Sequence, residues 1–482
     1  MNRLALEIAD LSSLSPLVTL LMGALGLLLI EAFSEKLSKK YSFYFTMITL
    51  VFAFFDTYQT KISTNELITR WVVVDNISQT FTYFFLAIGL GTVLLTKSFF
   101  SSIVVTCGEF YFLVLASLFG LILIASSADF LPLFLGLETL SLSLYILCTY
   151  VKKWKISHEA AIKYFLLGSI GAAFLLYGIA LTYGAIGDTR FDLLLTNYHL
   201  IDNTADKFLF NAGMAFVTVG FLFKAAAVPF HIWAPDVYAG SPTPVTAFMS
   251  VATKVGAFAA FTRVFLVELP NWNSIWNEGI AIISIITILY ANYVAIQQKQ
   301  LRRFFAYSGI SHSGFALIPI AAGGEGAIYA LLFYLAVYSF ATLGCFSVLC
   351  SLDVLKNLEN NDGIVLDDLK GLFYRSPFLA IIFSIFLMTL GGIPPTVGFL
   401  SKFFLFKIAL DSGFYTLTII ALFTTILSAF FYLRFIAIML RDQNEEKETK
   451  LSPAIVVLGS VCVLGIVWFS INPQLLLYLI EL

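Results

Sequence analysis

Four ionisable side chains lie inside long apolar runs of this sequence, where a charge is costly. Glu138 lies in LFLGLETLSLSLY, Lys224 in GFLFKAAAVPF, Lys254 in FMSVATKVGAF and Lys402 in VGFLSKFFLF. An ionised group at the centre of a bilayer costs about 2.5–3.5 kcal/mol on insertion scales. Burial and a neighbouring opposite charge have opposing effects on the protonation of such groups, so a Glu/Lys pair can switch protonation when its separation or hydration changes. These residue types indicate proton transfer within a membrane.

Each of these residues could instead be a locally paired packing or snorkelling residue. A lysine at the centre of a span can scarcely reach either interface, so snorkelling explains Lys254 and Lys402 poorly. Snorkelling is a better explanation for three basic residues that lie nearer the ends of spans, Arg263, Lys407 and Arg434.

Two histidines and one further lysine are secondary candidates. His312 lies in the polar run AYSGISHSGF, and His231 follows a proline-containing interruption. Each histidine is either a hydrogen-bonded structural residue or a proton carrier. Lys163 follows Glu159 by four residues, a spacing that supports either a simple helix pair or a lateral relay toward Glu138.

The composition indicates a lipid-embedded protein and excludes several other classes. Of 482 residues, 59% are hydrophobic and 12% charged, against roughly 45–50% and about 25% in soluble domains. A net charge of −2 argues against nucleic-acid binding, which relies on clustered Lys and Arg. The five cysteines lack metal-ligand spacing, and no phosphate-binding glycine loop is present. We expect no cofactor in this chain, so its energy must come from a partner or an ion gradient.

Long apolar runs repeat along the whole chain and predict an all-α integral membrane protein. A helix needs about 20 apolar residues to cross a bilayer, and runs without strict alternation favour helices over barrel strands. Fourteen such spans are expected, at 14–33, 42–60, 77–96, 109–126, 128–150, 161–184, 208–228, 244–266, 278–297, 304–321, 327–350, 377–410, 414–440 and 454–480.

Two of these spans are predicted to be broken helices. An unbroken helix over 377–410 would be about 50 Å long, too long for the bilayer, and the sequence GGIPP interrupts it at 391–395. In span seven, Pro229 follows Lys224 by five residues. Unwound backbone at membrane depth is tolerated only where protein or a watery cavity surrounds it, so both breaks suggest an ion path.

The distribution of basic residues predicts the orientation of the chain. The connections between spans 1–2, 3–4, 5–6, 9–10, 11–12 and 13–14 carry 16 of the 28 Lys and Arg residues, whereas the opposite side carries 5. Under the positive-inside rule, the basic side is cytoplasmic. Both termini are therefore expected on the outer, periplasmic side.

A weak internal repeat relates the two halves of the chain. Residues 159–178 and 325–344 match at six of twenty aligned positions. The two segments begin spans six and eleven, and an odd shift of five spans gives the copies opposite orientations. Inverted repeats are typical of transporters, although six matches between apolar helices carry little weight alone.

Three motifs occur in the same order as in a known family. The run FKAAAVPFHIWAPDVYAGSPTPVTAFMSVATK at 223–254, LRRFFAYSGISHSGF at 301–315 and GGIPPTVGFLSKF at 391–403 together resemble the antiporter-like proton-channel subunits of respiratory complex I. Within that family, the chain is most similar to the subunit N branch, because of its fourteen spans and the lysine at 402.

The resemblance implies two inverted five-helix repeats, with broken helices at spans seven and twelve. It divides the chain into an N-terminal three-helix segment, a first repeat (helices 4–8), a second repeat (helices 9–13) and a C-terminal helix. The implied boundaries are 1–108, 109–266, 278–440 and 454–482.

When the family's site residues are matched to this sequence by position, the resemblance implies that proton translocation depends on Glu138, Lys224, Lys254 and Lys402. His231 and His312 match positions that link half-channels, and Lys163 matches a secondary lysine. The implied partners are lipid and the other membrane-arm subunits of a NADH:quinone oxidoreductase. NADH, FMN, iron–sulfur clusters and quinone would be bound by partner subunits.

The expected location is a bacterial inner membrane, with a photosynthetic membrane as the other possibility. A subunit of a multi-subunit cation/proton antiporter is the alternative function, because it would share the same helices and lysines. A passive scaffold would leave the four buried charges unexplained.

Overall fold

The computed structural model describes residues 12–60, 65–102, 108–270, 272, 274–324, 326–356, 363–441, 452–474 and 476. Within these residues the chain is all-helical apart from three isolated β-bridges, as predicted. Twelve described helical segments are long and apolar enough to cross a membrane, and each coincides with a predicted span. The other two predicted spans, 42–60 and 377–410, fall on one long helix and on a pair of short ones.

The helices follow the apolar runs closely. The N-terminal helices are η1 (Ser12–Leu14), α2 (Ser15–Phe33), α3 (Glu35–Gln59), α4 (Glu66–Thr69) and α5 (Asn76–Ser102). The next group is α6 (Gly108–Ala125), α7 (Phe130–Cys148), α8 (Lys155–Ile186), α9 (Phe191–His199), α10 (Thr204–Ala225), α11 (Trp233–Gly240), α12 (Thr243–Phe261) and η2 (Thr262–Glu268). The second half contains α13 (Ser274–Gln297), α14 (Leu301–Ala322), α15 (Ala327–Lys356), η3 (Leu366–Leu369), α16 (Leu372–Arg375), α17 (Pro377–Gly391), α18 (Val397–Asp411), α19 (Tyr415–Met439) and α20 (Pro453–Ile471).

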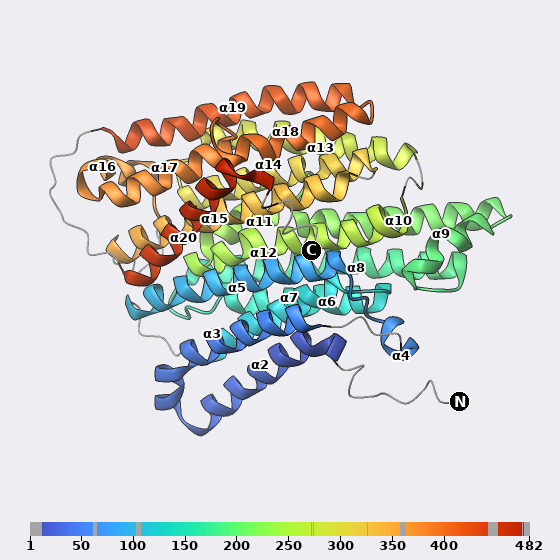
Figure 1. The fold of residues 1–482 in the computed structure, drawn as a ribbon, viewed down its shortest axis with the longest axis horizontal. Helices are drawn as coiled ribbons and strands as arrows, with labels where there is room; N and C mark the ends of the chain where they lie inside the picture. The colour runs from blue at the N-terminus through green and yellow to red at the C-terminus, as the bar shows by residue number, and fades with distance from the viewer. Residues whose placement is uncertain are drawn as a thin grey trace.

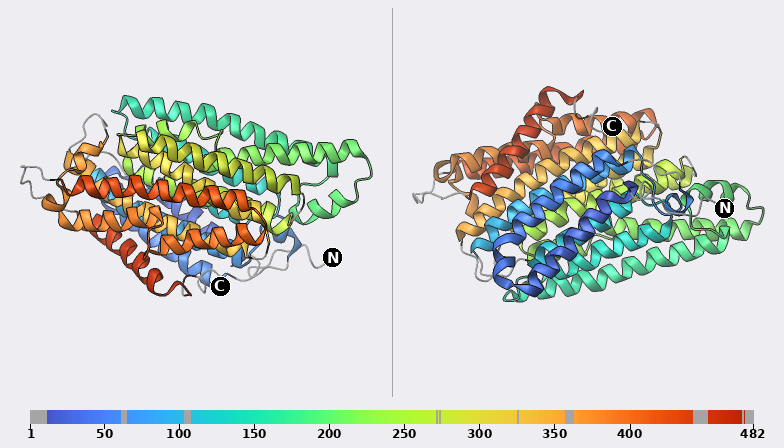
Figure 2. Two further views of the ribbon diagram at one scale, coloured as in Figure 1. Left: turned by 90° about the horizontal axis from the view of Figure 1, so that it is seen from above. Right: turned by 60° about the horizontal axis from the view of Figure 1, so that its bottom comes forward.

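The long helices lie side by side along one common direction (Figure 1). In that view α2 and α3 form the bottom and α19 the top, and α20 crosses the front obliquely, packed against α15 and α5. Figure 2 shows the same stack from two further directions. Three helices make up the interior. In the most apolar stretch of each, 89% of the residues of α12 (with η2), 94% of those of α14 and 83% of those of α15 are buried.

The first break lies between α10 and α11. α10 ends at Ala225 and α11 begins at Trp233. The backbone groups freed by the break find partners on other helices. The Ser313 hydroxyl of α14 donates to the Ala225 carbonyl at 2.6 Å, and the Val228 N–H donates to the Thr287 hydroxyl of α13 at 3.1 Å. The unwound segment is therefore stable at this depth because protein surrounds it.

The second break follows the GGIPP sequence. α17 ends at Gly391 and α18 begins at Val397. Gly392 adopts a left-handed conformation with φ of 71°, which a residue with a side chain rarely adopts. The Lys402 ammonium donates to the Gly391 carbonyl at 3.2 Å, and the Val397 N–H donates to the Ser470 hydroxyl of α20 at 2.8 Å. One of the four candidate residues thus stabilises the break directly.

Candidate proton-transfer site

Glu138 and Lys224 come together between α7 and α10. Lys224 is 4% exposed, and its ammonium donates to the Ser141 hydroxyl at 2.5 Å. Ser141 lies three residues after Glu138, on nearly the same face of α7. The charges of Glu138 and Lys224 interact, yet no direct ion pair joins them in the described chain. Among the described residues, the Glu138 Oε1 atom is buried and has no hydrogen-bond partner.

Lys254 lies at the middle of the stack, on α12. The side chain is 2% exposed, and its ammonium donates to the Tyr238 hydroxyl of α11 at 3.0 Å. Gly309 of α14 provides the space for it, because a Cβ atom at that position would lie 3.1 Å from Lys254 Cε. One turn earlier on α12, the Ser250 carbonyl accepts a hydrogen bond from the Tyr338 hydroxyl at 2.9 Å.

His312 lies one turn after Gly309 on α14 and is held between two tyrosine hydroxyls. Its Nδ1 atom is 2.6 Å from the Tyr334 hydroxyl, and its Nε2 atom is 3.4 Å from the Tyr432 hydroxyl. The Tyr432 hydroxyl is also 2.5 Å from the Ser308 hydroxyl. A hydroxyl both donates and accepts, so either neutral tautomer of the imidazole finds partners at both nitrogens.

Lys402 lies on α18 and lines a cavity together with His312. It is 3% exposed, and its ammonium lies 4.7 Å from the centre of the Phe315 ring, a cation–π contact. A cavity of about 10 Å³ is lined by both Lys402 and His312, which is about the room that one water molecule needs. The charges of Lys254 and Lys402 both act on the His312 ring. His312 is therefore within electrostatic reach of both lysines.

His231 lies in the first break, away from this row. It is buried, and its ring packs edge-on against Tyr290 with ring centres 4.8 Å apart. In the described part of the chain, its Nδ1 atom has no hydrogen-bond partner. No hydrogen bond or ion pair between described residues connects it with Glu138 or with the three buried lysines, so its predicted linking role remains a prediction.

Lys163 belongs to a surface network. Its ammonium lies 2.8 Å from Glu159, as the i, i+4 spacing predicted, and 2.9 Å from Asp236 of α11. Arg303 of α14 contacts the same carboxylate at 2.9 Å. The Lys163 side chain is 43% exposed, and among the described residues no hydrogen bond or ion pair links it to Glu138. The network connects α8, α11 and α14 at the surface.

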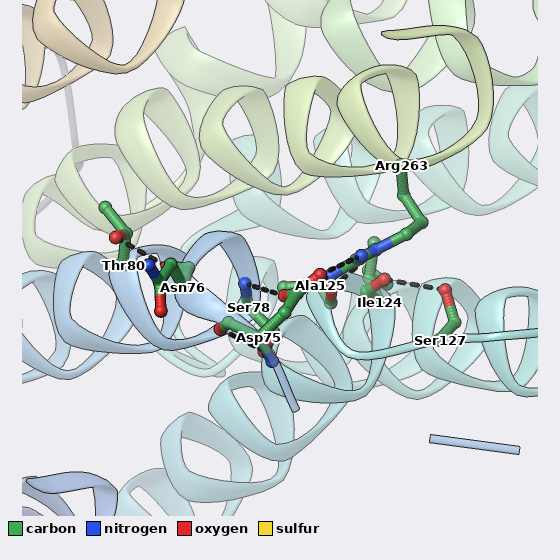
Figure 3. Close-up of polar contacts among 8 residues, drawn as sticks. All are labelled: Asp75, Asn76, Ser78, Thr80, Ile124, Ala125, Ser127 and Arg263. Carbon is green, nitrogen blue, oxygen red and sulfur yellow. Dashed lines mark hydrogen bonds and ion pairs between the residues drawn. The ribbon is translucent and has the colours of Figure 1, made fainter. Parts of the chain in front are cut away.

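Arg263, expected from the sequence to be a snorkelling or locally paired residue, forms an ion pair with a residue 188 positions away. Its guanidinium donates to the two Asp75 oxygens at 2.6 and 2.9 Å and to the Ala125 carbonyl at 2.8 Å (Figure 3). Burial alone would raise the pKa of Asp75, but the hydrogen bond and the charge of Arg263 outweigh it and hold that pKa below its usual value. The contact ties η2 to the start of α5 and the end of α6.

Sequence reasoning missed the hydroxyl groups around the candidates. Tyr334, Tyr338 and Tyr432 lie in apolar helices, where a tyrosine pointing inward cannot be told from one facing lipid. Tyr238 was part of a quoted motif, and the signal that could have found it is its neighbourhood of prolines, which marks a helix break at membrane depth.

Residues 127–428 match the family model described as NADH:quinone oxidoreductase/Mrp antiporter, TM. The matched segment exceeds half of the chain and contains every candidate site residue. The chain belongs to this family. With twelve apolar membrane-length segments among its described residues, this family member is a multi-pass integral membrane protein.

Curated relatives match the family member over nearly its full length. The NADH-quinone oxidoreductase subunit N of Protochlamydia amoebophila is 50% identical over 470 residues, 97% of each chain. A chain of respiratory complex I from Thermus thermophilus is 31% identical with a TM-score of 0.81, covering 96% of this chain and 98% of that one. A chain of the Mrp complex from Dietzia sp. has the same TM-score of 0.81 at 20% identity, covering 98% and 96%. The Mrp likeness shows a shared fold.

Proposed function

We propose that this chain is a proton-translocating membrane-arm subunit of a NADH:quinone oxidoreductase, complex I. The observation that carries the proposal is the set of three buried lysines, Lys224, Lys254 and Lys402, in a chain half identical to a subunit N along its length. The charges of the last two act on His312. Electron transfer from NADH through FMN and iron–sulfur clusters to quinone would take place in partner subunits. The chain would lie beside other membrane-arm subunits and lipid.

The geometry supports a route along the row. A proton from the cytoplasmic side would reach Lys224 or Lys254, pass His312 and its tyrosine hydroxyls, and arrive at Lys402 through the small cavity the two residues share. Release to the outer side would follow. Each hydroxyl can accept one proton while donating another, which a relay requires.

Glu138 would act as the electrostatic switch. Its charge interacts with that of Lys224, whose ammonium donates to the Ser141 hydroxyl and not to a carboxylate of a described residue. Moving one proton against 100 mV requires about 2.3 kcal/mol. We infer that a neighbouring subunit changes the charge or hydration of Glu138. This change would act on Lys224 and supply the free energy needed to move the proton. His231 and Lys163 would serve as secondary relay residues.

The proposal includes fourteen spans in two inverted repeats. The segments α6–α12 and α13–α19 each contain five membrane-crossing units, and in each the fourth unit is the broken one. A lysine lies beside each break, Lys224 before the first and Lys402 after the second. This correspondence supports the domain boundaries 1–108, 109–266, 278–440 and 454–482.

The expected location is a bacterial inner membrane with both termini on the periplasmic side. The support is the distribution of basic residues, with 16 of 28 on one set of connections. The alternative, a subunit of a multi-subunit cation/proton antiporter, has the support of the shared fold with the Mrp complex chain.

Proton pumping in sealed membrane vesicles tests the proposal. Substituting Lys224→Ala or Lys254→Ala should lower NADH-driven proton pumping together with coupled quinone reduction. Lys97→Ala is the matched control, because Lys97 is an exposed lysine on α5, and it should pump normally. Normal pumping by both test variants would refute the assignment. Activity that depends on sodium and needs no NADH would favour the antiporter alternative.

A further inference from the structure

A pocket of about 340 Å³ opens between the start of α15 and the end of α18. This is within the range of small-molecule sites in proteins, roughly 300–1,000 Å³. Its lining includes Lys407, Asp411 and Ser412 of the α18 end, and Gly323 and Gly324 of the preceding connection to α15. Neither Lys402 nor His312 lines this pocket; they line a different cavity.

Two opposite charges line this pocket without neutralising each other. Lys407 and Asp411 are four residues apart on α18, a spacing at which opposite charges commonly pair. Both side chains are exposed and both line the pocket. Neither makes an ion pair or a side-chain hydrogen bond with another described residue of the chain. Among its described lining residues, the pocket therefore presents one cationic and one anionic group to whatever enters it.

The walls of the pocket and the surface beside it are apolar. Phe404 and Ile408 line it, and Phe403 on the same helix is 50% exposed. Tyr329, which also lines the pocket, is 44% exposed, and Tyr415 at the start of α19 is 64% exposed. Exposed tyrosines at helix ends are typical of the membrane interface. The pocket thus lies at the depth of lipid headgroups, next to a surface suited to acyl chains.

We propose that this pocket binds a phospholipid with a phosphoethanolamine headgroup. Lys407 would contact the phosphate, and Asp411 would accept hydrogen bonds from the ammonium group. Asp411 disfavours a headgroup with net negative charge, and a carboxylate binds a primary ammonium, which has N–H donors, better than a quaternary one. The space beside Gly324 is open, because a Cβ atom there would have no neighbour within 4 Å.

Photo-crosslinking of the assembled complex in lipid nanodiscs tests this inference. The probe is a phosphatidylethanolamine with a photoreactive acyl chain, compared with phosphatidylglycerol carrying the same chain. The ethanolamine probe should label peptides around 404–412 and 326–330 preferentially. Lys407→Gln should lower that labelling about fivefold, as loss of one exposed charge contact implies. Asp411→Asn should reduce the preference for ethanolamine over glycerol.

Lys207→Gln is the matched control, because Lys207 is a partly exposed lysine on α10 outside this pocket, and it should leave the labelling unchanged. Equal labelling by both probes in the unsubstituted complex would overturn the inference, even if a variant failed to assemble. Displacement of the probe by soluble phosphoethanolamine would also overturn it, since the ligand would then be a free phosphoester. So would labelling of a neighbouring subunit by the ethanolamine probe without labelling of these peptides. A Lys254→Ala complex that does not pump should still be labelled, so this test is independent of the proposed function.

Discussion

Hydroxyl groups contact two of the three buried lysines and the buried histidine at the centre of the row. Ser141 accepts from Lys224, Tyr238 accepts from Lys254, and Tyr334 contacts His312. A hydroxyl stabilises an ammonium group without fixing its charge, whereas a carboxylate at contact distance would hold it protonated. We infer that these contacts keep the lysines able to exchange protons.

Ser141 provides a test at the residue scale. Ser141→Ala removes the hydroxyl that lies 2.5 Å from the Lys224 ammonium. Hydrogen bonds to charged groups contribute about 1.5–3 kcal/mol, so we expect NADH-driven proton pumping to fall about tenfold. Ser143→Ala is the matched control, because the Ser143 hydroxyl donates to the Thr139 carbonyl of its own helix. Equal pumping by the two variants would contradict the role given to Ser141.

At the scale of helices, the two breaks show what the sequence could and could not predict. The break at 391–395 followed from helix length and from the GGIPP run, and the structure confirms it between α17 and α18. The partners of the freed backbone groups could not be predicted. Ser313 and Ser470 come from helices that the sequence does not place beside the breaks, and only tertiary packing decides which helix supplies them.

Two glycines with positive φ, Gly392 and Gly413, allow the effect of backbone strain to be distinguished from the effect of moving Lys402. Gly392→Ala and Gly413→Ala each introduce a side chain at positive φ, 71° and 82°, at a cost of about 1–2 kcal/mol. At Gly392 the new Cβ atom would also lie 2.8 Å from Lys402 Cδ, whereas at Gly413 it would meet nothing within 4 Å. We expect only Gly392→Ala to lower pumping per assembled complex, measured with subunit content as the reference. The same loss in both variants would show that strain alone is responsible.

At the scale of the whole molecule, the Arg263–Asp75 pair joins the N-terminal helices to η2, which continues the central helix α12. Asp75 lies in a connection and Arg263 lies 188 residues later, so sequence periodicity could not match them. The class of fold, the helix positions and the three buried lysines were all visible in the sequence. The hydroxyl network and this pair were not, because they depend on which helices become neighbours.

Removal of the Asp75 charge tests this connection. Asp75→Asn should destabilise the subunit by up to about 3 kcal/mol, less than for a fully buried pair because Asp75 is 34% exposed. Asp192→Asn, at an exposed ion pair with Arg190, should have an effect below about 1 kcal/mol. Thermal dissociation of the subunit from the purified complex measures both. Indistinguishable dissociation temperatures for the two variants would contradict the structural role of the pair.

The lowered pKa of Asp75 sets the pH range of that stabilisation. A carboxylate whose pKa is lower in the folded state stabilises the fold above its unfolded pKa, about 3.9, and loses this contribution as the pH falls through the folded value. The difference between Asp75→Asn and the unsubstituted subunit should therefore stay constant from pH 5 to pH 8. A difference that shrinks within this range would show that the pair does not lower the pKa.

The central claim is that protons cross the membrane along the row that ends at Lys402. The most direct measurement is the number of protons pumped per quinone reduced, in sealed vesicles containing the complex with Lys402→Ala. A lower ratio or a joint loss of pumping and quinone reduction is the result this account predicts, with Lys97→Ala unchanged. An unaltered ratio at an unaltered turnover rate would contradict it.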